Sequence, residues 1–464
     1  MKVRVNPTIF REYDIRGVVG RDLTSDVAEA IGRAYAVYLK SQSPNSSAPL
    51  PVIVGQDNRE SSPEMGQAVR RSLAASGCQV IDLGTVITPV FYYARVHERI
   101  DGGVMITASH NPPEFNGFKL AHGFGTMYGE EIQEIRRLTE HGAAVSGVGT
   151  VKKQDIVPDY RAMLKEKIKL RRRLRVVLDC GNGTASLIAP EVLEDLGVDL
   201  TCLYCDSDPR FPHHHPDPVR PENLKDLIAT VRQTHADVGI GLDGDGDRIG
   251  VVDERGEILW GDTLMILFWR EILPKYPGTV GIVEVKCSQA LYEEIARLGG
   301  RPMFYKTGHS LIKAKMKEVG AIFTGEMSGH MFFADEYYGY DDAVYAAARL
   351  LRILSGTDKS LSALLADVPR YYSTPEIRVD CPDEVKFRVV EEITREFKRR
   401  YEVIDIDGAR VLFADGWGLI RASNTQPALV LRGEATTPAG LERIKRTLEG
   451  ELRKFPDVGP VVWQ

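Results

Sequence analysis

Cysteine is scarce in this sequence, with six residues in a chain of 464. That is too few for a disulfide-stapled scaffold, so the cysteines do not predict a cross-linked secreted fold. Long hydrophobic runs are also missing: the longest, at 264–269, falls far short of the roughly 20 residues that span a bilayer. The opening stretch MKVRVNPTIF contains no apolar segment of signal-peptide length. We therefore expect a cytoplasmic protein without a membrane partner.

Charge of one sign is not in excess either. Lys and Arg number 59 and Asp and Glu 65, so the formal net charge is −6. A general nucleic-acid binder needs a basic surplus, and we therefore expect no nucleic-acid partner. A local basic pocket for a phosphorylated small molecule stays possible. Hydrophobic residues at 43% and charged residues at 27% are ordinary for globular proteins and exclude fibrous and disordered classes.

Short apolar strands, Gly- or Asp-rich turns and amphipathic helices alternate along most of the chain. Strand patterns at 51–55, 175–179 and 280–285 are each followed by a helical pattern, which favours α/β layers. The last part changes to a charged helix, several short β runs and a final helix, an α+β pattern. We predict three α/β domains and a C-terminal α+β domain, with bounds 1–150, 151–255, 256–368 and 369–464.

Two connecting segments carry finer expectations. The low-complexity stretch 41–51 is interpreted as a connector between a helix and a strand. The run C-G-N-G-T-A-S at 180–186 has Ser186 in place of the third glycine of a dinucleotide fingerprint. We interpret it as a tight turn into a helix near 185–196.

Cys202 and Cys205 precede three histidines at 213–215. The histidines are consecutive and not spaced as zinc ligands, so the pattern does not favour a zinc site.

The run T-A-S-H-N-P at 107–112 follows an apolar strand and leads into a loop toward Lys119. Ser109 at the end of a strand, with His110 beside it and Lys119 within reach, is a candidate nucleophile or phosphate carrier. The alternative reading, from spacing alone, is a polar β-turn whose serine caps the next element.

Three aspartates alternate with glycines at 243–247. Their carboxylates can converge on a divalent cation because the glycines let the backbone curl around it. Crowded carboxylates are costly without a cation, which favours a metal site over a solvated acidic turn. The pattern does not favour an EF-hand, because Arg248 stands where that loop needs glycine and the flanks are strand-like.

Two further loops offer polar groups for a ligand. In G-E-M-S-G-H at 325–330, Glu326 and Ser328 can hydrogen-bond vicinal hydroxyls and His330 can carry a proton; the alternative is an ordinary loop. In R-A-S-N-T-Q-P at 421–427, an arginine followed by hydroxyl and amide side chains suits a phosphate dianion; the alternative is a polar turn.

With these four runs in this order, nearly the whole chain resembles the α-D-phosphohexomutases, closest to their bacterial phosphomannomutase/phosphoglucomutase branch. The resemblance implies four domains around a central cleft, with sugar phosphates as small-molecule partners. It implies interconversion of hexose 1- and 6-phosphates of mannose and glucose, through a phosphoserine and a hexose 1,6-bisphosphate that is both intermediate and activator. Whether the protein is a monomer or a weak dimer stays open.

Two other activities are compatible with parts of the pattern. Phosphoglucosamine mutase is the alternative within the family, but that branch usually carries Gln and Ala where this chain has Met327 and Gly246. A phosphatase with a phosphoserine intermediate would not need the loops at 325–330 and 421–427. We therefore expect the mannose/glucose mutase.

The resemblance also implies a role for each matching residue. Ser109 would be the phosphoserine and would bind Mg²⁺ together with Asp243, Asp245 and Asp247. The catalytic groups near the transferred phosphoryl would be Arg16, His110, Lys119 and Arg248, with His330 as general base. The substrate-binding residues would be Lys286, His309, Glu326, Ser328, Arg421, Ser423, Asn424 and Thr425.

Overall fold

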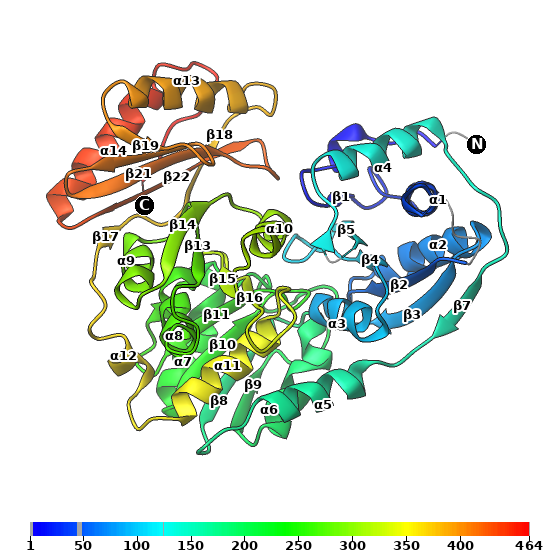
Figure 1. The fold of residues 1–464 in the computed structure, drawn as a ribbon, viewed down its shortest axis with the longest axis horizontal. Coiled ribbons are helices and arrows are strands. Elements are labelled where there is room, and N and C mark those ends of the chain that lie inside the picture. The colour runs from blue at the N-terminus through cyan, green and yellow to red at the C-terminus, as the bar shows by residue number, and fades with distance from the viewer. Residues whose placement is uncertain (1–2, 44–48, 124, 464) are drawn as a thin grey trace. The chain divides into compact units, whose positions relative to one another are not determined.

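The computed structural model describes residues 3–43, 49–123 and 125–463 (Figure 1). The chain forms two compact units, each made of two segments. Unit 1 contains Met1–Ile272 and Ser328–Leu365, and unit 2 contains Leu273–Met327 and Ala366–Gln464. In the described ranges no helix is long and apolar enough to cross a membrane.

The first sheet of unit 1 has the strand order β1-β5-β4-β2-β3-β7, with β6 beside β5. β2 is parallel to β3 and β4, whereas β5 is antiparallel to β4 and β1. This register places Lys119 of β5 opposite Met105 of β4, near the end from which the Ser109 turn starts. The strands are β1 (Ile15–Val18), β2 (Pro51–Gln56), β3 (Gln79–Thr85), β4 (Gly102–Ile106), β5 (Phe115–His122), β6 (Gly125–Thr126) and β7 (Thr150–Lys153).

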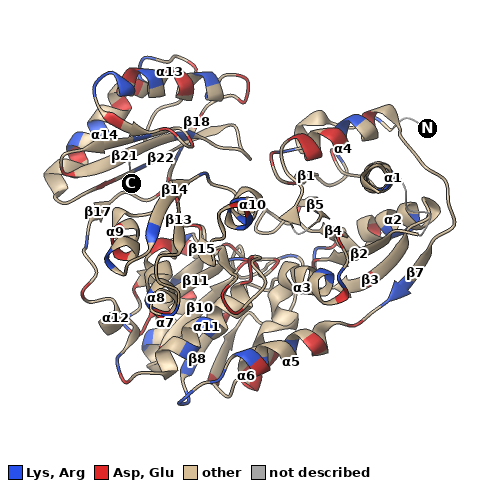
Figure 2. Cartoon of the chain, in the orientation of Figure 1, with Lys and Arg blue, Asp and Glu red and all other residues tan. Residues whose placement is uncertain are grey.

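Helices cover both faces of this sheet. Successive residues of a strand point to opposite sides, so the neighbours of two adjacent residues show what lies on each face. Leu39 of α1 borders Gly102, whereas Phe91 of α3 borders the next residue, Gly103. α1, α2 and α4 share one apolar core with the strands. Figure 2 shows charged residues of both signs on α4. The helices are α1 (Ser25–Gln42), α2 (Ser62–Ala75), α3 (Thr88–Glu98) and α4 (Glu130–His141).

The second sheet of unit 1 has the order β12-β11-β10-β8-β9. β8 is parallel to β9 and β10, and β10 forms an antiparallel hairpin with β11. Every residue of β10 and β11 is buried, so the aspartate loop that joins them starts from a rigid base. The strands are β8 (Arg175–Asp179), β9 (Asp199–Leu203), β10 (Val238–Leu242), β11 (Ile249–Asp253) and β12 (Ile258–Leu259).

The remaining elements of unit 1 are mostly helical. They are η1 (Pro7–Ile9), α5 (Val157–Lys167), η2 (Thr184–Leu187), α6 (Ala189–Asp195), η3 (Pro221–Leu224), α7 (Lys225–Thr234), α8 (Gly261–Ile272), β16 (Met331–Phe333), α11 (Ala343–Ser355) and α12 (Leu361–Leu364).

Unit 2 contains a parallel strand pair with its helices and a separate antiparallel sheet. The pair is β13 with β14, and the sheet has the order β17-β22-β21-β20-β19, with β18 beside β22. α13 contacts β19, β20 and β21, and α14 contacts β21 and β22. The elements are β13 (Val280–Glu284), α9 (Gln289–Arg297), β14 (Arg301–Tyr305), α10 (His309–Val319), β15 (Phe323–Gly325), β17 (Tyr372–Ser373), β18 (Ile377–Asp380), α13 (Lys386–Lys398), β19 (Glu402–Ile404), β20 (Ala409–Phe413), β21 (Gly416–Ala422), β22 (Ala428–Ala435) and α14 (Pro438–Leu452).

The predicted α/β fold with an α+β C-terminal part is confirmed, with local differences. The helix expected near 185–196 is a 3₁₀ turn, Thr184–Leu187, followed by α6, because Pro190 has no N–H to continue a helix from the preceding turn. Of the predicted connector 41–51, residues 44–48 lie outside the described residues. Its first two residues belong to α1, and Pro51 begins β2.

Candidate active site

Ser109 lies in the turn after β4, and its side chain is buried. Its φ of +51° is in the left-handed region, which is unfavourable for a serine and persists only where the surroundings hold it. Here the Ser109 N–H donates to Thr107 Oγ1 over 2.9 Å. The turn brings Ser109 Oγ to 2.8 Å from Asp243 Oδ2 and 3.1 Å from His110 Nδ1. The predicted polar turn and the predicted carboxylates therefore meet at one hydroxyl.

Arg59, which the sequence analysis did not single out, holds this turn from behind. Its fully buried guanidinium donates to the carbonyl oxygens of Ser109 at 2.8 Å and Pro112 at 2.7 Å, and also to that of Asn111. Asp57 pairs with its Nε over 3.2 Å. The only local feature in the sequence that could have indicated this role is that Arg59 stands two residues after Asp57, at the end of an apolar strand.

The aspartate loop gathers three buried carboxylates. Asp243 Oδ1 accepts from the N–H groups of Asp247 at 3.0 Å and Arg248 at 3.1 Å, which fixes the loop. The ligand-type oxygens of Asp243, Asp245 and Asp247 lie within 4.8 Å of one another. Among the described residues, Asp245 Oδ1 and Asp247 Oδ1 are buried oxygens without a hydrogen-bond partner. Oxygen atoms placed in this way are suited to a hard divalent cation.

The electrostatics of the loop support the same interpretation. Burial, together with the charges of Asp247 and Asp245, holds the pKa of Asp243 well above its usual range. Burial acts in the same direction on Asp245, but the charge and hydrogen bond of Lys119, the hydrogen bond of Thr88 and the charge of Arg16 together outweigh it and lower the pKa of that carboxyl. An added divalent cation would relieve the repulsion that remains, so these residues fit the Mg²⁺ that the family resemblance implies.

Lys119 is the principal cation of the site. Its Nζ donates to Asp245 Oδ2 over 2.8 Å and also contacts Asp247 Oδ2. Burial lowers the pKa of Lys119, but the two carboxylates outweigh it and hold that pKa well above its usual range. Thr88 Oγ1, another residue that the sequence analysis missed, donates to Asp245 Oδ2 over 2.6 Å.

Arg16 of β1 reaches the same turn from the neighbouring strand. Its Nη1 donates to Asn111 Oδ1 over 2.7 Å and lies 3.5 Å from the carbonyl oxygen of Ala108. Asp14 Oδ2 lies 2.6 Å from Arg16 Nε and orients the guanidinium. Arg16 and His110 therefore lie at the Ser109 turn, and Lys119 binds the carboxylate cluster that Ser109 touches.

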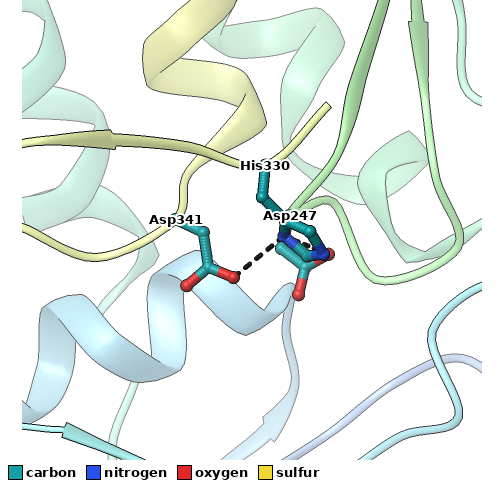
Figure 3. A group of neighbouring side chains, drawn as sticks. All are labelled: Asp247, His330 and Asp341. Carbon is teal, nitrogen blue, oxygen red and sulfur yellow. Dashed lines mark ion pairs between the residues drawn. The ribbon is translucent and has the colours of Figure 1, made fainter. Parts of the chain in front are cut away.

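The ring of His330 lies beside the carboxylates of Asp247 and Asp341 (Figure 3). Arg248 Nε donates to His330 Nε2 over 3.0 Å. Since Nε2 accepts, the ring proton is on Nδ1, which faces Asp341 Oδ2 at 3.0 Å and Asp247 Oδ1 at 3.6 Å. Asp341 is fully buried and lies eleven residues beyond His330, so no local motif revealed it.

In unit 2, the loops that follow β13, β14 and β15 share carboxylate partners. Lys286 Nζ donates to Glu376 Oε2 over 2.9 Å and lies 3.9 Å from Glu284 Oε1. Glu326 Oε1 accepts the N–H of Gly308 over 2.7 Å. His309, the first residue of α10, has its Nδ1 3.3 Å from the ammonium group of Lys313.

Arg421 is tied to the same group of loops. Its Nε donates to Asp407 Oδ2 over 2.9 Å, and the N–H of Thr307 donates to that oxygen over 3.0 Å. Asp407 was not predicted from the sequence. The loop after Arg421 is folded around Ser423, whose Oγ accepts the N–H groups of Thr425 at 3.4 Å and Gln426 at 3.1 Å.

The predicted residues thus form two sets, one in each unit. The structure brings together Ser109, Arg16, His110, Lys119, the three aspartates, Arg248 and His330 in unit 1. It brings together Lys286, His309, Glu326 and the 421–425 loop in unit 2. Ser328 is half-buried at the start of the second segment of unit 1, and Asn424 is half-buried in the loop after β21.

An α/β framework that presents a buried serine to a carboxylate cluster and several cations is a framework for phosphoryl transfer. Family models for phosphoglucomutase/phosphomannomutase match along the chain: alpha/beta/alpha domains I, II and III at residues 7–145, 158–256 and 260–372, and the C-terminal domain at 376–450. The chain belongs to the phosphoglucomutase/phosphomannomutase family.

Individual relatives are similar over almost the full length. A phosphomannomutase/phosphoglucomutase of Pseudomonas aeruginosa is 46% identical over 455 residues, which cover 98% of this chain and 97% of that protein. A phosphoglucomutase of Neisseria gonorrhoeae is 43% identical over 453 residues, covering 97% of each. The crystal structure of a phosphoglucomutase/phosphomannomutase family protein from Burkholderia thailandensis has a TM-score of 0.91 at 41% identity, covering 97% of this chain and 98% of that one.

Proposed function

We propose that this chain interconverts the 1- and 6-phosphates of mannose and glucose through phospho-Ser109 and a hexose 1,6-bisphosphate. The observation that carries the proposal is the 2.8 Å contact between Ser109 Oγ and Asp243 Oδ2 in a buried cluster of carboxylates and cations. The names of the Pseudomonas and Neisseria relatives support the substrate class.

The cycle has two phosphoryl transfers. A hydroxyl oxygen of the sugar monophosphate forms a bond to the phosphorus of phospho-Ser109, while the bond from phosphorus to Oγ breaks. The bisphosphate then turns over in the site, and Ser109 Oγ takes back the other phosphoryl group. Each cycle therefore changes the position of the phosphate and restores the phosphoserine.

The transferred phosphoryl group carries its charge on three equatorial oxygens, so catalysis depends on positioned cations. We assign this role to Arg16 and His110, which lie at the Ser109 turn, and to Lys119, which binds the carboxylate cluster beside it. His330 is the general base for the attacking hydroxyl, because its Nε2 is the unprotonated ring nitrogen. Arg248 occupies that nitrogen in the free protein and would turn toward the substrate when the hydroxyl replaces it.

Asp243, Asp245 and Asp247, with an oxygen of phospho-Ser109, would hold Mg²⁺. When bound, this ion would offset the charge that develops on Ser109 Oγ as its bond to phosphorus breaks. The orphaned oxygens of Asp245 and Asp247 support the assignment. Chelation with EDTA is expected to abolish turnover, and added Mg²⁺ to restore it. Full activity in a preparation shown to be free of metal would contradict the proposal that the reaction requires Mg²⁺.

The substrate contacts are assigned mainly to unit 2. Glu326 and Ser328 hold the 3- and 4-hydroxyls of the sugar, and Lys286 and His309 contact the substrate. The clamp for the phosphate that is not reacting consists of Arg421, Ser423, Asn424 and Thr425. Because both ends of the sugar visit Ser109 in turn, the clamp recognises a dianion and not a carbon position.

We also propose the domain division 1–150, 151–255, 256–368 and 369–464. The ranges matched by the four family models support it.

A substrate panel tests the proposal directly. Purified protein receives mannose 1-phosphate, glucose 1-phosphate or glucosamine 1-phosphate, with Mg²⁺ and a trace of hexose 1,6-bisphosphate. The 6-phosphate and free phosphate are followed in each case. We expect comparable turnover of the first two sugars, little of the third, and no free phosphate.

Each other outcome has a definite meaning. Preference for the amino sugar would assign the chain to phosphoglucosamine mutase; a Methanopyrus kandleri protein with the name "probable phosphoglucosamine mutase" is 36% identical over 438 residues. Release of phosphate without isomerisation would make water the acceptor. No reaction of any kind would contradict the assignment of Ser109.

A further inference from the structure

Three cysteines that the proposed reaction does not use gather where β8 and β9 end. The two strands are parallel neighbours, with Leu178 opposite Cys202, so the segments that leave their carboxyl ends lie side by side. The sulfur atoms of Cys180 and Cys205 are 3.5 Å apart. Cys180 is buried, Cys205 is half-buried and Cys202 is exposed. All three thiols are free.

The cluster does not have the geometry of a metal site. Among the described residues, the groups of metal-ligand atoms that converge contain no cysteine. The histidines that follow are occupied elsewhere: His213 Nδ1 contacts Asn182 Oδ1 at 2.8 Å, and His214 Nε2 contacts Asp179 Oδ2 at 3.0 Å. The arrangement of Cys180 and Cys205 is that of a dithiol pair.

The turn that begins at Cys180 packs directly on the aspartate loop. The N–H of Thr184 donates to the carbonyl oxygen of Gly244 over 2.8 Å. A β-carbon on Gly183 would lie 3.0 Å from Gly244 Cα, and one on Gly244 would lie 2.4 Å from the carbonyl oxygen of Ser109. Three segments of backbone are thus in close contact, and a shift of the turn cannot leave the other two unchanged.

We propose that Cys180 and Cys205 are a site of reversible oxidation by hydroperoxides, and that the disulfide between them displaces the 180–184 turn from the aspartate loop and so slows phosphoryl transfer. A disulfide bond is about 2.05 Å long, so the sulfur atoms must approach by about 1.5 Å from their present separation. The turn is already constrained, because Asn182 has a φ of +58° and its N–H is bonded to the carbonyl of Tyr204. It therefore moves as a unit.

The chemistry consumes one hydroperoxide for each disulfide. The Cys205 thiolate attacks the distal oxygen, the O–O bond breaks, and the leaving alkoxide or hydroxide takes up a proton. The resulting sulfenic acid is then attacked by the Cys180 sulfur, which forms the S–S bond and releases water. The two thiols lose two electrons, and the peroxide gains them. A dithiol reductant reverses the step.

The ionisation of the cluster favours Cys205 as the thiol that reacts first. The hydrogen bond with Cys180 lowers the pKa of Cys205, and its sulfur is more accessible than that of Cys180. Desolvation and the neighbouring Cys205 raise the pKa of Cys202 to about 12, so this exposed thiol is a poorer nucleophile.

Mass spectrometry tests the chemical step independently of activity. The full-length protein is treated with hydrogen peroxide, remaining thiols are blocked, and the intact mass is recorded. All three cysteines lie on one tryptic peptide, 176–210, so digestion with Glu-C and chymotrypsin is needed to separate them at Glu191 and Tyr204. We expect a loss of two hydrogens and a cross-link between Cys180 and Cys205, reversed by dithiothreitol.

The activity measurement tests the coupling. Peroxide is expected to lower turnover at least about fivefold in the natural protein, with recovery on reduction. Cys205→Ala should keep its activity under the same treatment, whereas Cys381→Ala, a buried cysteine of unit 2, should respond like the natural protein.

Three outcomes would overturn the proposal. They are a cross-link between Cys202 and Cys205, addition of oxygen without any cross-link, and a Cys180–Cys205 cross-link that leaves turnover unchanged. If the untreated protein has no mutase activity, the proposed function is wrong, and the mass measurement still shows whether Cys180 and Cys205 form a disulfide.

Discussion

Arg248 Nε donates a hydrogen bond to His330 Nε2 over 3.0 Å. This contact assigns the ring proton to Nδ1 and directs it toward the buried carboxylate of Asp341, 3.0 Å away (Figure 3). The pair resembles other carboxylate–imidazole arrangements in which an acid fixes the tautomer of a base. Asp341 is therefore a positioning residue for His330.

Asp341→Asn is expected to lower kcat about 10- to 100-fold with little change in KM, since the base is no longer held in one tautomer. Steady-state kinetics with glucose 1-phosphate measures both constants. Nitrogen NMR of labelled histidine should show the altered ring tautomer at constant pH. A fall in kcat that is accompanied by a fall in the melting temperature would indicate a structural role instead.

Ser109→Ala is expected to abolish both turnover and transfer of labelled phosphate from hexose 1,6-bisphosphate to the protein, because the variant lacks the hydroxyl that contacts Asp243. Ser41→Ala, at the exposed end of α1, serves as the matched control. Label on the Ser109→Ala protein would mean that a different residue carries the phosphoryl group.

Asp407 has a role that kinetics can isolate. Its Oδ2 orients both Arg421 and the N–H of Thr307, so Asp407→Asn should loosen the phosphate clamp. We expect KM to rise about 5- to 20-fold, in line with about 1–2 kcal/mol for a charge-assisted hydrogen bond, with a smaller change in kcat. Asp405→Asn, an exposed neighbour that pairs with Lys398, is the control. An unchanged KM would contradict this role.

Asp342 predicts a pH dependence of stability. Burial raises its pKa from 3.8 to about 6, although the N–H of Tyr345 and the hydroxyls of Tyr337 and Tyr160 donate to it. A pKa that is higher in the folded state means that the protonated acid stabilises the fold. That contribution is full below pH 3.8 and is lost as the pH rises through about 6, a change of about 3 kcal/mol.

Asp342→Asn cannot titrate, so the comparison between variant and natural protein isolates this group. Urea unfolding between pH 4 and pH 7 should show the variant gaining about 3 kcal/mol relative to the natural protein as the pH rises. A difference that does not vary with pH would show that Asp342 has an ordinary pKa in the folded protein.

Local sequence patterns predicted a large part of both fold and site. The strand at 175–179 agrees residue for residue with β8, because an apolar run bounded by a charged residue and a glycine turn leaves little freedom. The four loops were found for a similar reason: the residue types that phosphoryl transfer and cation binding require are clustered within six or seven positions of the chain.

Other residues of the site carry no local pattern. Arg59, Asp341 and Asp407 each hold a predicted residue that is separated from them along the chain, by fifty positions for Ser109. In the sequence they are single charged residues, and a charge on its own is most often solvated. Only their burial beside a partner shows what they do.

Residue type and spacing along the chain were therefore sufficient to predict the fold class, the order of the loops and the kinds of side chain that each loop offers. Which side chains contact each other became visible only in the folded chain: Ser109 with Asp243, His330 with Asp341, and Cys180 with Cys205. Hydrogen bonds and ion pairs form only between atoms about 3 Å apart. Strand pairing brings together residues that are more than a hundred positions apart in the sequence, such as Ile15 and Phe118, so local sequence patterns do not reveal which of them will be in contact.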